Sequence, residues 1–63
     1  MTAATRRAGR TVLVADDTAF VRDRFKAAIE AAGHKAVTAQ TGQELLAQVR
    51  ANASRIDLIV VDL

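Results

Sequence analysis

Two apolar runs in this chain of 63 residues end in aspartate. Residues 11–15 lead into Asp16 and Asp17, and residues 58–61 lead into Asp62. If both runs are strands of one parallel sheet, the three carboxylates meet at its carboxyl edge, where open α/β sheets bind ligands. Crowded carboxylates repel one another, and a hard divalent cation with oxygen ligands, such as Mg²⁺, relieves that repulsion. The sequence therefore predicts a metal-dependent phosphate site.

The sequence pattern clearly predicts the first strand and the helix after it. Residues 11–15 are apolar or β-branched without alternation, which is typical of a strand buried on both faces. Asp16, Asp17 or Thr18 can cap the following helix. Its inward stripe has helical spacing and comprises Val21, Phe25, Ala28, Ile29 and Ala32. Polar residues off this stripe, among them Arg22, are expected in water, and Gly33 ends the helix.

The second half repeats this alternation of strand and helix. Residues 36–39 predict a short strand, and residues 41–44 fit a capping box in which Thr41 and Glu44 bond each other's amides. The second helix turns its apolar side inward, with Leu45, Leu46, Val49 and Ala53, and ends near residues 52–55. Residues 56–61 form the third strand. The order β-α-β-α-β with short connections predicts an α/β fold with a parallel sheet.

Composition excludes several classes of protein. There are no cysteines, and no apolar stretch has the length of a membrane span or a signal peptide, so we expect a soluble protein of the cytoplasm. The formal net charge of +2 comes largely from residues 1–10, which we interpret as a flexible basic arm. With two phenylalanines as its only aromatic residues, the chain lacks the stacking platforms that single-stranded nucleic acid needs.

Several residues have simpler structural interpretations. Asp16 or Asp17 alone can be a helix cap, and Asp62 alone a turn residue. Asp57 precedes the third strand, at the opposite edge of the sheet, and is expected in solvent. His34 has no Cys or His at ligand spacing and is interpreted as a surface residue near a helix end. Phe20 and Phe25 are expected to pack in or near the core, and no glycine motif for dinucleotides or a P-loop follows the first strand.

The ordered set of motifs resembles the receiver domain of two-component response regulators. The resemblance rests on residues 12–17 (VLVADD), 32–34 (AGH), 39–46 (AQTGQELL) and 57–63 (DLIVVDL). It covers residues 11–63 and implies a flavodoxin-like parallel sheet in the strand order 2-1-3. A receiver has five strands and five helices, so the resemblance implies that this segment corresponds to the N-terminal half of a receiver.

The resemblance also implies a role for each of the three aspartates. Asp62 would accept a phosphoryl group from a phosphohistidine of a sensor histidine kinase or phosphotransfer protein. Asp17 and Asp62 would ligate Mg²⁺ directly, and Asp16 directly or through water. Such a domain is a bacterial signalling switch and not an enzyme that turns over a metabolite. Three working parts of the family have no counterpart here: a metal-binding carbonyl two residues past the phosphoacceptor, a Ser or Thr ending the fourth strand, and a Lys ending the fifth.

Two other functions remain open from the sequence. A receiver-derived module without phosphotransfer would act through its docking surfaces, and binding unaffected by Mg²⁺ or Asp62→Asn would favour it. A metal-dependent phosphatase-like fragment would turn over a phosphate ester. In the 2-1-3 order the third strand also has a bare outer edge without proline or lysine. We therefore expect self-association, pairing with a complementary receiver fragment, or a partly unfolded chain.

Overall fold

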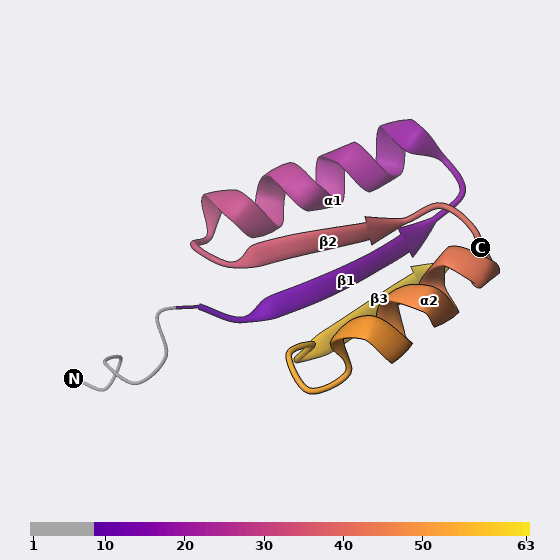
Figure 1. The fold of residues 1–63 in the computed structure, drawn as a ribbon. Helices are drawn as coiled ribbons and strands as arrows, with labels where there is room; N and C mark the ends of the chain where they lie inside the picture. Colours follow the sequence, from indigo (N-terminus) through magenta and orange to yellow (C-terminus); the bar gives the residue numbers. More distant parts are fainter. Residues whose placement is uncertain (1–8) are drawn as a thin grey trace.

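The central strand of the sheet is the first one, buried on both faces as its unbroken apolar run predicts. A computed structural model describes residues 9–63, so residues 1–8 of the predicted basic arm lie outside the described part. The strands are β1 (Thr11–Asp16), β2 (Lys35–Ala39) and β3 (Leu58–Asp62), and the helices are α1 (Ala19–Ala31) and α2 (Gly42–Asn52). All three strands are parallel and lie in the order β2-β1-β3. The predicted α/β class, element order and strand order are confirmed (Figure 1).

The two helices cover opposite faces of the sheet (Figure 1). The crossover through α1 runs from β1 to β2, and the one through α2 runs back past β1 to β3, so right-handed connections place them on opposite sides. Leu45 and Val49 of α2 pack on Leu13, Ala15 and Ala39. Since side chains alternate along a strand, Val12, Val14 and Asp16 face the α1 side.

Local hydrogen bonds explain where the helices begin and end. Gly33 has φ +90° and His34 donates its N–H to the carbonyl of Ile29 at 3.1 Å, which is a Schellman motif closing α1. At the start of α2, Thr41 Oγ1 accepts the N–H of Glu44 at 3.1 Å, as the capping box predicts. The carboxylate of Glu44 instead reaches Gln40, whose N–H it accepts at 2.8 Å.

Several predicted inward residues are exposed. Phe20 and Phe25, expected in or near the core, are 68% and 42% exposed, and Leu46 is 55% exposed. Ala28, Ala32 and Ala53 are also exposed. Periodicity locates the apolar side of a helix, but a sheet of three short strands covers only part of that side. Half-buried Val21 and Ile29 of α1 mark the part that is covered.

Strand β3 lies at the edge of the sheet and is poorly covered on either face. Leu58, Ile59 and Val61 are 57%, 41% and 53% exposed. The strand begins two residues later than predicted, because Ile56 and Asp57 belong to the connection from α2. Within the described residues, no helix is long and apolar enough to cross a membrane.

We predict that β3 drives self-association. A long apolar edge strand pairs readily with another chain, and a lysine placed on such an edge opposes this. Val61→Lys is expected to shift the sedimentation profile from concentration-dependent larger species toward monomer. Leu46→Lys removes a similarly exposed apolar side chain away from the edge and should leave the profile unchanged. A monodisperse wild-type monomer with a cooperative melt would contradict the prediction.

We predict opposite effects of the same substitution at two glycines. Gly33→Ala forces a side chain into a left-handed conformation and should lower the free energy of unfolding by about 1–2 kcal/mol. Gly42→Ala adds a methyl group at the start of α2 that meets only a side-chain atom of Leu63, at 3.9 Å, and should raise it by a few tenths of a kcal/mol at most. Urea unfolding at one protein concentration measures both, and equal effects of the two changes would refute the account.

Candidate functional site

Asp16 and Asp62 end neighbouring strands at the same level. The register of β1 and β3 pairs Val14 with Val60, Ala15 with Val61 and Asp16 with Asp62. Partners in a parallel register project from the same face, so both carboxylates lie on the α1 side of the sheet at its carboxyl edge. The structure thus brings together two of the three predicted site residues.

The two paired aspartates differ in burial. The side chain of Asp16 is 3% exposed, because it ends the central strand beneath the start of α1, whereas Asp62 is exposed on the edge strand. Asp16 Oδ1 accepts the N–H of Thr18 at 2.8 Å. This bond fixes the turn between β1 and α1, and it leaves the second carboxylate oxygen of Asp16 for another partner.

Asp17 lies in the turn just beyond β1 and is exposed. Its Oδ1 accepts a long hydrogen bond of 3.4 Å from the hydroxyl of Thr18. The N-cap residue of α1 is Thr18, so neither aspartate takes the helix-capping position that was the simpler interpretation. Asp17 remains one residue from Asp16 on an exposed turn, within reach of the same edge.

One basic residue belongs to this edge although the apolar pattern of α1 does not indicate it. Arg22 is half-buried, and its Nη1 donates to the main-chain oxygen of Asp16 at 2.9 Å. Sequence analysis placed Arg22 in water because it falls off the apolar stripe. The residue lies one helical turn past Thr18, a spacing that allows its long side chain to fold back to the end of β1.

The three carboxylates have no basic partner among residues 9–63. Among residues 9–63, neither Asp16, Asp17 nor Asp62 forms an ion pair with a Lys, Arg or His side chain. Like charges at this spacing repel, and Asp16 is also removed from water. A bound cation would relieve both costs.

The donor set suits Mg²⁺ in part. No three Asp, Glu, His or Cys side chains of the described segment converge as a ready-made metal group. Mg²⁺, however, is usually held by one or two carboxylates and keeps several waters, with phosphate oxygens completing its shell. Asp16 and Asp62 fit that smaller requirement, and Asp17 does not form a group of three with them in the described segment.

The opposite edge of the sheet carries contacts that sequence analysis missed. Asp57 Oδ2 accepts the N–H of Thr11 at 2.8 Å, and the Asp57 N–H bonds the Thr11 carbonyl at 2.8 Å. His34 Nδ1 accepts the N–H of Arg10 at 3.0 Å. Asp57 and His34 are exposed as expected, but both hold the start of β1 in place.

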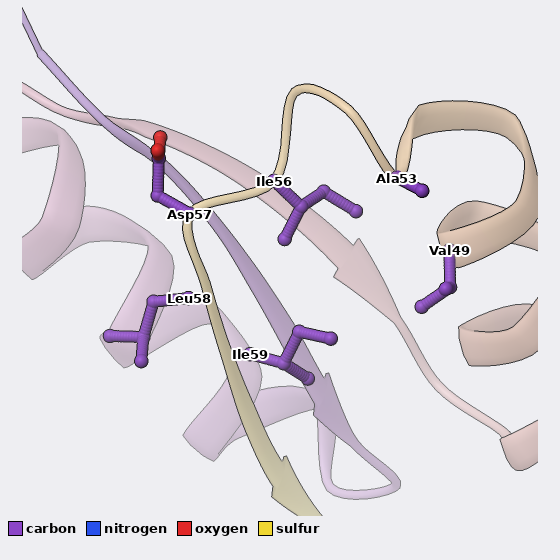
Figure 2. A pocket seen from close by; sticks show the side chains of 6 residues that line it. All are labelled: Val49, Ala53, Ile56, Asp57, Leu58 and Ile59. Carbon is purple, nitrogen blue, oxygen red and sulfur yellow. The ribbon is translucent and has the colours of Figure 1, made fainter.

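A pocket between α2 and β3 also lies away from the acidic edge. It is lined mainly by apolar residues, namely Val49, Ala53, Ile56, Asp57, Leu58 and Ile59. Figure 2 shows Ile56 and Ile59 turned toward Val49, while Leu58 points to the other side of the strand. The pocket has one carboxylate, already bonded to Thr11, so it offers no second site for a metal.

The fold and this edge define an α/β protein with a partial flavodoxin-like sheet, whose carboxyl edge is acidic. Comparison with known proteins adds no closer relationship: no family model, no curated protein and no solved structure matches the chain.

We predict that Asp16→Asn stabilises the fold. Asparagine keeps an oxygen that accepts the Thr18 N–H, and it removes one of two like charges. The two charges lie on adjacent strands, whose backbones are about 5 Å apart. The free energy of unfolding should rise by about 1 kcal/mol in urea without metal. Asp23→Asn, on the exposed surface of α1, should change it little. A loss of stability in Asp16→Asn would mean that the carboxylate is held by favourable contacts.

Proposed function

We propose that this chain acts as a phosphoacceptor in a two-component phosphorelay, with Asp62 as the residue that receives the phosphoryl group. The observation that carries the proposal is the pairing of Asp62 with the buried Asp16 at the carboxyl ends of adjacent parallel strands. It agrees with the motifs by which the sequence resembles receiver domains. The proposal places the protein in the bacterial cytoplasm, as a switch and not as an enzyme with turnover.

The transfer needs little machinery. A carboxylate oxygen of Asp62 attacks phosphorus, the bond from phosphorus to the imidazole nitrogen of the phosphohistidine breaks, and the imidazole leaves with the bonding electrons and takes up a proton. Mg²⁺, when bound, neutralises charge on the phosphoryl oxygens. The exposure of Asp62 on the edge strand gives a donor access to it.

The roles of the other two aspartates follow from their positions. Asp16, held by its bond to Thr18, provides a fixed carboxylate beside the acceptor. Asp17, on the exposed turn, can approach the ion from the solvent side. Both would hold the ion together with Asp62. Because the three carboxylates are negative, they would repel an anionic phosphodonor unless a cation is bound first.

A second function has its own supporting observation. The bare edge and exposed apolar side chains of β3 suit a receiver-derived interaction module that pairs with a complementary receiver fragment or another chain. That module would bind its partner equally with and without Mg²⁺ and would tolerate Asp62→Asn. A phosphoacceptor, by contrast, would not be phosphorylated without Mg²⁺ or after Asp62→Asn.

We predict phosphorylation of Asp62. Incubation with Mg²⁺ and a small acyl phosphate, followed by intact-mass measurement, should show the gain of one phosphoryl group. Asp62→Asn and removal of Mg²⁺ should each abolish it. Asp57→Asn is the matched control, since it changes the aspartate just before the other end of β3 and leaves an acceptor oxygen for Thr11. No gain in folded wild-type protein would exclude an autonomous phosphoacceptor and favour the module.

We predict weak Mg²⁺ binding at the same edge. Shifts of the amide NMR signals of residues 16, 17 and 62 should report the titration, since a site of carboxylates and water without further protein ligands holds the ion loosely. Asp17→Asn should weaken the binding about tenfold or less, by analogy with the loss of one charged interaction. A titration unchanged by Asp17→Asn would remove Asp17 from the site.

A further inference from the structure

Arg22 makes a contact at the acidic edge that the proposed phosphotransfer does not explain. Its Nη1 donates to the main-chain oxygen of Asp16 at 2.9 Å, and the side chain is half-buried. An arginine in this place could serve either to neutralise the carboxylates or to hold the backbone that carries them.

Three hydrogen bonds converge on the turn between β1 and α1. The guanidinium of Arg22 holds the carbonyl of Asp16, Asp16 Oδ1 holds the N–H of Thr18 at 2.8 Å, and the Arg22 N–H donates to the carbonyl of Thr18 at 2.9 Å. Residue 16 is therefore bonded through its main chain and through its side chain. The direction of its carboxylate is fixed before any ligand arrives.

Arg22 makes no direct ion pair with the carboxylates among the described residues. Its acceptor is a neutral carbonyl, and among the described residues it forms no ion pair with the three aspartates. Coulomb's law alone makes a positive charge beside a cation site a disadvantage for the cation. The contact therefore serves geometry, and any benefit to metal binding must exceed this electrostatic cost.

We infer that Arg22 is a positioning residue for the metal site, acting through the backbone of Asp16. The inference rests on the proposed function, because it concerns the same Mg²⁺ site. By holding the turn, Arg22 restricts the conformations of Asp16 and Asp17 before the ion binds. Binding then costs less conformational entropy.

The sign of one substitution separates positioning from charge. Arg22→Met keeps most of the apolar stem and removes the guanidinium. If charge dominates, the loss of a nearby positive charge raises Mg²⁺ affinity. If positioning dominates, the affinity falls by about threefold to tenfold, which corresponds to the net contribution of one ordinary intramolecular hydrogen bond.

Two further variants control the experiment. Arg24→Met removes the same charge from the same helix, but Arg24 is exposed and lies over the ring of Phe20, 5.5 Å from its centroid, and has no contact with Asp16 among the bonds described. It should leave Mg²⁺ affinity unchanged or slightly raised. Arg22→Lys keeps a positive charge and a donor without the planar fork, and its affinity should lie between those of Arg22→Met and wild type.

The measurement is an Mg²⁺ titration followed by amide NMR, with amide hydrogen exchange of Thr18 recorded without metal. Positioning predicts weaker binding and faster exchange at Thr18 in Arg22→Met, and neither change in Arg24→Met. Equal or tighter binding by folded Arg22→Met would overturn the inference while leaving the proposed function intact. Wild-type protein that binds no Mg²⁺ would overturn both. If Arg22→Met does not fold, Arg22→Lys decides the matter, since faster exchange at Thr18 with an Mg²⁺ affinity equal to wild type would refute positioning.

Discussion

Burial of β1 on both faces is the constraint on which the rest of the structure depends. A strand with no solvent face must have a helix on each side and a hydrogen-bonded neighbour on each edge. Those requirements determine the crossovers through α1 and α2 and the flanking positions of β2 and β3. They also carry Asp16 into the interior, because the strand that must be buried ends in a carboxylate. The acidic edge is thus a product of the way the core is built.

The cost of that carboxylate explains the local bonding around it. A buried charge without an ion pair is tolerated when its oxygens accept hydrogen bonds, and Asp16 receives one from the backbone of Thr18. Its neighbour across the register is another aspartate on an exposed strand. A cation held between these two carboxylates would offset their mutual repulsion, which is the physical reason for proposing a metal there.

Patterns of short range in the sequence predicted most of the fold. The unbroken apolar run predicted β1, Gly33 predicted the end of α1, and the acidic residues after two strands predicted the edge at which Asp16 and Asp62 meet. The contact of Arg22 with Asp16 was not predictable, since the partner of a long side chain depends on where the chain folds back. The exposure of Phe20 and Phe25 was missed for another reason: periodicity gives the direction of an apolar face but not the area of the surface that covers it. Binding of Mg²⁺ by the three aspartates and phosphorylation of Asp62 stay predictions.

The length of β1 separates the two ends of the sheet electrically. Its six residues span about 20 Å, whereas the screening length at physiological ionic strength is about 8 Å. The charges of Arg10 and Asp57 at one end and those of the aspartates at the other therefore act almost independently. A change of charge at the acidic end would reach His34 only as a mechanical displacement of the strand. The NMR signals of residues at that end can thus serve as an internal reference while the opposite end is loaded with ions.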